Sequence, residues 1–209
     1  MASFNKTGIG FPNFNILIER ESEKIVIMDE GRDSLACSCE FSGIKPVMVE
    51  LPYPPVKVRN ENLTYANLLS IDYCGAVSEM TAITQYINHE NRLAASRCPM
   101  AKALLGMAIS EMMHLQKLSQ MIVLLGGKVD YTAKFRNGDW KIWTPEYIKS
   151  PEQARQMLQA DLDAERATID QYRMHINMIA DNYINDVLER IIKDEEYHVM
   201  MLQFLLKEV

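Results

Sequence analysis

The sequence has no CxxC pair, although it contains four cysteines, at positions 37, 39, 74 and 98. Thiolates paired at that spacing are what a rubredoxin-like iron site or a zinc ribbon requires, so neither kind of site is expected. Cys37 and Cys39 form a CxC, and two interpretations of it stay open: a redox or metal pair, or separate reduced thiols. No activity is therefore predicted from the cysteines.

Positive charge and long apolar runs are also scarce. The 22 Lys and Arg residues are outnumbered by 28 Asp and Glu residues, for a net charge of -6, which gives no electrostatic reason to expect nucleic acid as a partner. Apolar runs such as MIVLLGG are far shorter than the ~20 residues that span a bilayer, so no membrane partner is expected. The first residues, MASFNKTGIGFPNFN, lack a basic segment followed by an apolar one, and we expect a cytoplasmic protein without a signal peptide.

What the sequence does contain is enough apolar material for a core, with 48% hydrophobic residues over 209 positions. Residues 1–60 are rich in β-branched residues interrupted by Gly and Pro, which predicts a hairpin or an extended N-terminal arm. Residues 61–209 have the apolar spacing of amphipathic helices. We therefore predict an all-α domain at 61–209 preceded by an arm.

Four helices are expected in that domain, and the signals at their ends differ. The first is predicted over residues 63–93, and the second from Pro99 to the pair Gly126–Gly127. The third is predicted to begin at a capping box formed by Ser150, Pro151 and Gln153. The fourth is predicted from Asp181 or Asn182 almost to the end of the sequence. Residues 128–149 connect the second helix to the third, and so long a connection is uncommon in a compact domain. A four-helix bundle with one long crossover accommodates it.

The two predicted helix pairs resemble each other. EMTAITQY at 79–86 matches ERATIDQY at 165–172, and SEMMHLQ in the second helix matches DEEYHVM in the fourth. The matching glutamates lie 86 positions apart in one case, Glu79 and Glu165, and 84 apart in the other, Glu111 and Glu195. A repeat of whole helix pairs predicts a site with pseudo-two-fold symmetry.

Each of the four helices carries one glutamate on its apolar face: Glu79, Glu111, Glu165 and Glu195. His114 and His198 follow two of them by three residues, which is about one helical turn. Burying unpaired carboxylates costs several kcal/mol each, whereas two divalent cations would balance four of them. One such Glu can be a satisfied core acid, and one Glu-x-x-His is more often a solvated pair. Six residues in this order across four helices favour a di-iron or di-manganese carboxylate site.

These motifs resemble those of the ferritin-like superfamily, especially bacterioferritin and rubrerythrin, over residues 53–206. The resemblance implies a ferritin-like four-helix bundle. It implies that Glu79 and Glu165 are terminal carboxylate ligands and that Glu111 and Glu195 bridge two metals. His114 and His198 match the imidazole ligands of the family.

Four further positions lie near these motifs. Tyr86 matches a tyrosine that is hydrogen-bonded near the metals, and Tyr172 is its partner in the repeat, although both could be core residues. Asp194 is expected to orient an imidazole, and its counterpart Ser110 makes that support asymmetric. Met112 lies where bacterioferritin has its haem-ligating methionine, but in a chain with 14 methionines a packing role is preferred and haem is not expected.

The implied activity is that of an oxidoreductase with two Fe ions, or alternatively two Mn ions, acting on hydrogen peroxide or dioxygen. A peroxidase-like or ferroxidase-like reaction is preferred, with manganese catalase-like dismutation or non-catalytic iron binding and storage as alternatives. An external electron donor is expected, because no iron–thiolate motif is present. The short segment after His198 leaves no room for the fifth helix of cage ferritins, so we expect a homodimer or a small homo-oligomer.

Overall fold

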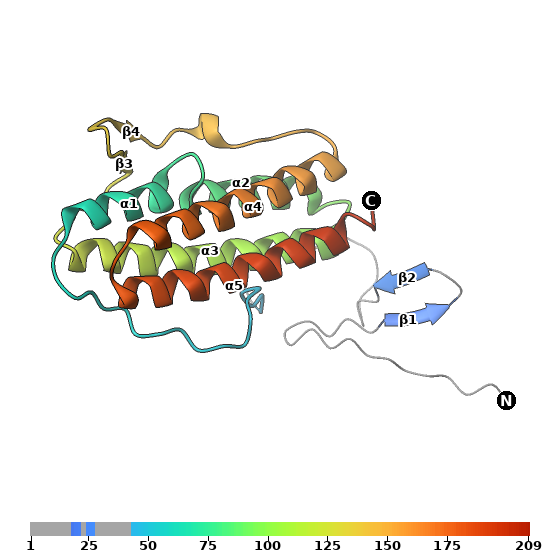
Figure 1. The fold of residues 1–209 in the computed structure, drawn as a ribbon. Helices are drawn as coiled ribbons and strands as arrows, with labels where there is room; N and C mark the ends of the chain where they lie inside the picture. Colours follow the sequence, from blue (N-terminus) through green and yellow to red (C-terminus); the bar gives the residue numbers. More distant parts are fainter. Residues whose placement is uncertain (1–17, 22–23, 28–42) are drawn as a thin grey trace.

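The computed structural model describes residues 18–21, 24–27 and 43–209. Its α-helices are α1 (Leu63–Cys74), α2 (Glu79–Leu93), α3 (Cys98–Leu124), α4 (Ala154–Met178) and α5 (Asn182–Leu205). Short strands form two antiparallel pairs, β1 (Ile18–Glu21) with β2 (Lys24–Ile27), and β3 (Thr132–Lys134) with β4 (Trp140–Ile142). Figure 1 shows α1 and α2 in succession along one edge of a bundle completed by α3, α4 and α5. The predicted all-α four-helix bundle is confirmed.

The first helix of the bundle is interrupted, so the prediction of one continuous helix over residues 63–93 is wrong. α1 ends at Gly75, where a Cβ atom would lie 2.6 Å from the carbonyl oxygen of Ile71. Ser78 then caps α2, because its side chain accepts a hydrogen bond from the amide of Thr81. The close approach at Gly75 and the new cap place the start of α2 at Glu79.

The ends of α3 and α5 agree with the sequence signals. α3 begins with Pro99 in its first turn, and Gly126 follows its last turn with φ +81°, a left-handed conformation that suits glycine. Asp181 caps α5 by accepting a hydrogen bond from the amide of Tyr183 at 3.0 Å. Both helices therefore keep the boundaries expected from their capping residues.

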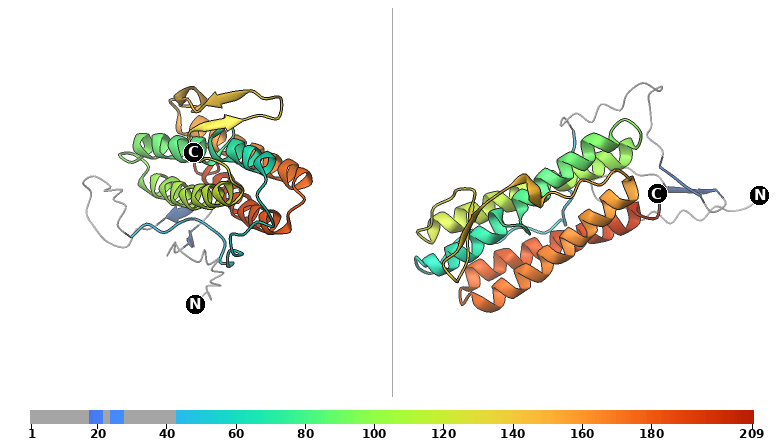
Figure 2. Two further views of the ribbon diagram at one scale, coloured as in Figure 1. Left: turned by 90° about the vertical axis from the view of Figure 1, so that its left-hand side faces the viewer. Right: turned by 90° about the horizontal axis from the view of Figure 1, so that it is seen from above.

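The crossover between α3 and α4 contains the β3–β4 hairpin and one 3₁₀ turn, η1 (Pro145–Tyr147). Figure 2 shows the hairpin outside the bundle, and the amide of Lys134 holds it to α1 through the hydroxyl of Ser70. The predicted capping box at Ser150 is wrong, since α4 begins at Ala154 with no side-chain cap. The reason is that Lys149 and Ser150 are held along α2, where their carbonyls accept from His89 and Arg92.

Two apolar cores lie at opposite ends of the bundle. One contains Leu118, Met121 and Leu188, and the other contains Leu104, Met107 and Leu202. Between these two groups, α3 and α5 carry buried polar side chains: Ser110, Glu111 and His114 on α3, and Asp194, Glu195 and His198 on α5. The middle of the bundle is therefore the place where a polar site is enclosed between two apolar layers.

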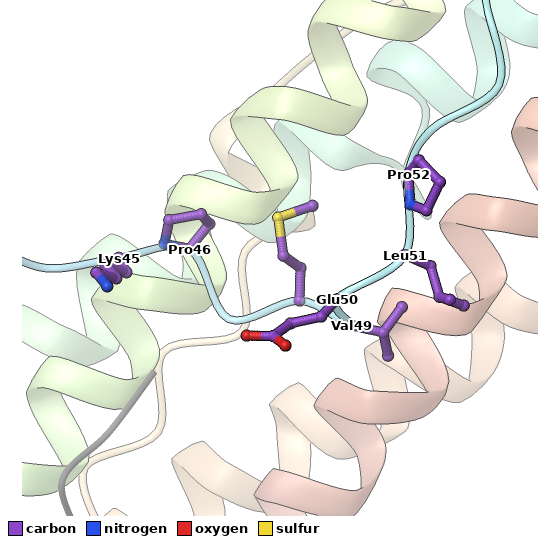
Figure 3. Close-up of a pocket in the computed structure, with 7 residues that line it drawn as sticks. Lys45, Pro46, Val49, Glu50, Leu51 and Pro52 are labelled. Atoms are coloured by element: carbon purple, nitrogen blue, oxygen red, sulfur yellow. The ribbon is translucent and has the colours of Figure 1, made fainter. Parts of the chain in front are cut away.

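Residues 43–62 run as an extended segment along the bundle. Val47 is buried, and its amide donates to the carbonyl of Gly106 in α3 at 3.0 Å. Figure 3 shows residues 45–52 crossing over α3 and α5. The predicted boundary at residue 60 stays a prediction, and Cys37 and Cys39 lie outside the described residues. No helix among the residues that the structure describes is long and apolar enough to cross a membrane.

Candidate metal centre

The six predicted ligands meet in the middle of the bundle. Each side chain is buried, with at most 3% of its surface exposed, and each of the helices α2, α3, α4 and α5 contributes one glutamate. The members of this cluster are Glu79, Glu111, His114, Glu165, Glu195 and His198. Burial of four carboxyl groups together requires compensating positive charge or protonation.

The cluster divides into two groups that share two carboxylates. Ligand atoms of Glu79, Glu111, His114 and Glu195 all lie within 4.8 Å of one another, and so do those of Glu111, Glu165, Glu195 and His198. Each group thus has one carboxylate and one imidazole of its own, together with the shared pair Glu111 and Glu195. This arrangement could hold two cations side by side with two carboxylates between them.

Both imidazoles direct the same ring nitrogen at the carboxylates. Nδ1 of His114 lies 2.7 Å from Glu111 and 3.1 Å from Glu195, and Nδ1 of His198 lies 3.0 Å from each of the same two residues. Their Nε2 atoms lie on the opposite side, 3.2 Å from Asp194 and 2.6 Å from the carbonyl oxygen of Val47. A carbonyl or a carboxylate accepts hydrogen bonds, so each Nε2 donates its proton outward.

The lone pairs of this cluster that no hydrogen bond uses are suited to a cation. With Nε2 protonated, Nδ1 of a neutral imidazole presents a lone pair to carboxylate oxygens that also carry lone pairs. In addition, Oε1 of Glu111 and Oε1 of Glu195, the two shared carboxylates, accept no hydrogen bond from the described residues. A metal ion can accept several lone pairs that point toward one another in this way. Carboxylate and imidazole ligands suit iron and manganese.

The electrostatics of the protein alone favour protons in the same places. Burial and the charges of Glu111 and Glu195 raise the pKa of Glu79 and Glu165 well above the usual range. Burial lowers the pKa of the two histidines, but the facing carboxylates outweigh it and raise the pKa of both. A cation entering the cluster would have to displace these protons.

Two buried tyrosines donate hydrogen bonds across the pseudo-two-fold axis. The hydroxyl of Tyr86 on α2 donates to Glu165 on α4, and the hydroxyl of Tyr172 on α4 donates to Glu79 on α2. Burial and the neighbouring carboxylates raise the pKa of both phenols well above the usual range, so they remain donors. Each tyrosine therefore orients the unshared carboxylate contributed by the other half of the repeat.

Asp194 lies behind His114 and is held by several groups. Its carboxylate accepts from Nε2 of His114 at 3.2 Å, from the hydroxyl of Tyr53 at 2.5 Å and from the amide of Val49 at 2.8 Å, and it pairs with Arg190 at 2.7 Å. Burial raises the pKa of Asp194, but these partners outweigh burial and lower it. The carboxylate is thus ionised and placed where a group that orients an imidazole must lie.

The counterpart of Asp194 in the repeat, Ser110, does not contact an imidazole. Its hydroxyl donates to the carbonyl of Val47 at 2.7 Å, and that same carbonyl lies 2.6 Å from His198. The predicted asymmetry is present in the contacts: a carboxylate lies behind one imidazole and a backbone carbonyl behind the other. Val47 and Tyr53, which supply these contacts, gave no recognisable signal in the sequence.

A second pair of buried polar groups was also missed by the sequence reasoning. On one side Nδ1 of His89 lies 2.9 Å from Asp161, which also accepts from Gln85 at 2.8 Å. On the other side Nδ1 of His175 lies 2.8 Å from Asp72, which also accepts from Gln171 at 2.8 Å. The signal was present, because QYxxH occurs twice, at residues 85–89 and 171–175.

Glu196 and Met112 lie outside the cluster. Glu196 is exposed and pairs at 2.9 Å with Arg173, which is also exposed. Met112 is 39% exposed on the surface of α3, and the structure does not place it with the six cluster residues. A surface pocket of about 310 Å³ is lined by residues 45–46 and 48–52 (Figure 3), and none of the cluster residues lines it.

The sequence matches the ferritin-like domain family over residues 76–209, which is more than half of the chain. Together with the four-helix bundle and its crossover, this match defines the class: a ferritin-like helical-bundle protein with a buried carboxylate and histidine cluster. The chain belongs to the ferritin-like family. A search of curated proteins found no match.

Solved structures with the same fold include enzymes and ferritins. KatB, a manganese catalase from Anabaena, is 22% identical with a TM-score of 0.66, and the match covers 77% of this chain and 78% of that chain. Bacterioferritin from Rhodobacter capsulatus is 26% identical with a TM-score of 0.60, covering 71% and 86%. Mycobacterium tuberculosis bacterioferritin BfrA is 24% identical with a TM-score of 0.59, covering 71% and 87%. The resemblance to the ferritin-like superfamily is confirmed.

Proposed function

We propose that this chain is a di-metal carboxylate oxidoreductase that acts on hydrogen peroxide or dioxygen, with reduction of peroxide as its preferred reaction and ferroxidase activity as a closely related one. The observation that carries the proposal is the pair of shared carboxylates, Glu111 and Glu195, whose free oxygens and neighbouring Nδ1 lone pairs converge. Two Fe ions, or two Mn ions, are the cations that such a ligand set suits.

The proposed ligands divide into equivalent halves. Glu79 and His114 would bind one ion, Glu165 and His198 the other, and the shared carboxylates both. When bound, two such ions supply Lewis acidity and the electrons for cleaving an O–O bond. The chain's own part is to hold the ligands in a buried site between two apolar cores, which excludes bulk water.

The tyrosines Tyr86 and Tyr172 are positioning residues in this proposal. Each keeps its proton and donates to the carboxylate oxygen of Glu165 or Glu79, which fixes the orientation of a carboxylate that binds only one ion. Asp194 has the matching role for His114. An ordered set of ligands lowers the cost of reorganisation when the charge on the ions changes.

Reduction of hydrogen peroxide to two water molecules consumes two electrons and two protons, so the proposal includes an external electron donor. The described residues hold one free cysteine, the buried Cys74, and no iron–thiolate centre that could serve as an internal donor. We expect the protein to act as a homodimer or a small homo-oligomer.

The test is peroxide consumption by the metal-loaded protein, measured with and without a reductant such as ascorbate. The proposal predicts consumption that requires the reductant and that is lost in Glu111→Ala. Metal-loaded protein that consumes neither peroxide nor dioxygen under either condition would support non-catalytic metal binding and storage instead.

Manganese catalase-like dismutation is a second candidate, favoured by the fold similarity to KatB. In that reaction one peroxide is oxidised to dioxygen while another is reduced to water, so no external electrons are needed. An oxygen electrode separates the two candidates: oxygen release without reductant supports dismutation, whereas consumption without oxygen release supports the peroxidase-like reaction.

A further inference from the structure

Seven residues of the N-terminal segment, Val47–Tyr53, contact His198 directly and His114 through Asp194, and we refer to them as the strap. Figure 3 shows this part of the chain crossing from α3 to α5. At the first helix the amide of Val47 donates to Gly106, and at the second the amide of Val49 donates to Asp194. Arg190 adds hydrogen bonds to the carbonyls of Val49 and Leu51 at 2.9 Å each.

At one end the strap contacts His198 directly. The carbonyl oxygen of Val47 lies 2.6 Å from Nε2 of His198, and it also accepts from Ser110 at 2.7 Å. Because a carbonyl is only an acceptor, this contact places the proton on Nε2 and leaves Nδ1 for the cluster. The strap backbone thus determines both the tautomer and the direction of this ring.

At the other end the strap contacts His114 through Asp194. The carboxylate that lies behind His114 receives the hydroxyl of Tyr53 on Oδ2, the same oxygen that faces Nε2 of the ring. Two cations lie near the ring of Tyr53, with Nζ of Lys117 4.0 Å and Cζ of Arg190 4.3 Å from its centroid. Helices α3 and α5 therefore each contribute one cation–π contact to Tyr53.

The close approach of the strap to α3 depends on a glycine in the interior of that helix. A Cβ atom on Gly106 would lie 2.8 Å from a side-chain methyl of Val47 and 3.0 Å from the carbonyl of Lys45. Glycine inside a helix is less favourable than alanine, so its presence here needs another reason. Room for the strap supplies that reason.

We propose that the strap positions both imidazoles of the metal centre, with the Val47 carbonyl acting on His198 and Tyr53 acting through Asp194 on His114. The inference rests on the proposed di-metal site and adds residues outside the helices to it. Partners behind metal-binding histidines change metal affinity by about 10–100-fold when removed. Each end of the strap therefore controls the affinity of a different ion.

The first test is Tyr53→Phe, which removes the hydroxyl and keeps the ring that Lys117 and Arg190 contact. Tyr65→Phe is the matched control, because Tyr65 is also half-buried and its hydroxyl also binds the bundle, at the amide of Ala180. Anaerobic titration with Mn²⁺ should show two ions for the wild type and the control. In Tyr53→Phe one ion should bind about 10–100-fold more weakly while the other keeps its affinity.

The second test is Gly106→Ala, which keeps α3 helical and displaces the strap at Val47. It should weaken the ion bound by His198, whereas Tyr53→Phe weakens the ion bound by His114. Double variants assign the ions: Tyr53→Phe should have no further effect on Mn²⁺ affinity in a His114→Ala background, and Gly106→Ala none in a His198→Ala background. Far-ultraviolet circular dichroism monitors the helices in every variant.

The outcomes separate this inference from the proposed function. Wild-type protein that binds fewer than two Mn²⁺ ions would contradict the metal centre itself. Two ions in the wild type, together with wild-type affinities in both Tyr53→Phe and Gly106→Ala, would leave the metal centre intact and overturn the role of the strap. Equal weakening in Tyr65→Phe and Tyr53→Phe would also overturn it, since the effect would then follow from general loss of packing.

Discussion

Three consecutive acids on α5 have three different surroundings. Asp194 lies behind His114 and contacts Tyr53 and Arg190, whereas Glu195 faces the centre of the bundle, and one of its oxygens accepts no hydrogen bond from the described residues. Glu196 is exposed and pairs with an exposed arginine, an interaction that contributes little to stability. Because an α-helix has 3.6 residues per turn, adjacent acids point in different directions. A shift of one position along α5 therefore separates a proposed metal ligand from a surface charge.

The raised pKa values in the cluster predict how metal binding depends on pH. Glu79, Glu165 and both histidines bind protons more tightly in the folded chain than in the unfolded chain. Groups with a raised pKa stabilise the fold below their unfolded values, about 4.3 for Glu and about 6.5 for His, and that stabilisation is lost as pH rises through the folded values. The metal-free protein should therefore lose stability with rising pH.

Metal ions should reverse this trend, because they replace the protons that the cluster otherwise holds. We expect the increase in Tm on adding Mn²⁺ to be larger at pH 8 than at pH 6. Thermal unfolding followed by circular dichroism at the two pH values measures it, with Glu195→Gln as a control that should show little increase at either. An increase that shrinks as pH rises would contradict the proton displacement.

At the scale of the elements, two polar contacts cross between the halves of the repeat. His89 on α2 pairs with Asp161 on α4, and His175 on α4 pairs with Asp72 on α1. All four side chains are at most 2% exposed. These two pairs, together with the crossed tyrosine contacts, tie each helix hairpin to the other around the cluster.

Removal of one partner from such a buried pair should be costly. Asp161→Ala leaves His89 facing a cavity without its acceptor, and we expect a loss of roughly 3–5 kcal/mol in the free energy of unfolding. Urea denaturation of the metal-free protein measures it. Asp163→Ala is the control, because Asp163 is exposed and its side chain contacts Gln159 on the same helix. Equal midpoints and slopes for the two variants would show that the pair contributes nothing.

Helical periodicity and the internal repeat were sufficient to predict the bundle, its crossover and the meeting of six side chains. Glu79 and Glu165 could be paired in advance because each occupies the apolar face of its helix at matching positions. The break at Gly75–Ser78 was missed, although a glycine followed by a serine cap carries a local signal. Helical periodicity alone does not reveal a four-residue interruption.

The strap could not be predicted in the same way. Val47 contributes a backbone carbonyl, which every residue has, and Tyr53 acts on a residue 141 positions away in the chain. Neither contact leaves a periodic pattern. Gly106 is a trace of the strap within α3, and the reason for a glycine there becomes clear only from the segment that packs against it.

At the scale of the whole molecule, a cluster of ionisable side chains lies in the middle of the bundle, where a helical bundle ordinarily has an apolar core. Two apolar cores enclose it lengthwise, and the strap covers it across α3 and α5. Burial of these carboxylates without compensation would cost several kcal/mol for each ion, which is a large fraction of the net stability of a domain. This cost supports our proposal that the bundle holds two cations.

The most direct measurement of that claim is the metal content of Glu195→Gln compared with Glu196→Gln, two adjacent substitutions with the same chemistry. Each protein is purified, stripped of metal, incubated with Mn²⁺ or anaerobically with Fe²⁺, and analysed by inductively coupled plasma mass spectrometry. We predict two ions per chain for the wild type and Glu196→Gln, and fewer than one for Glu195→Gln, because Glu195 contributes to both halves of the cluster. Equal metal content in the two variants would contradict the di-metal centre.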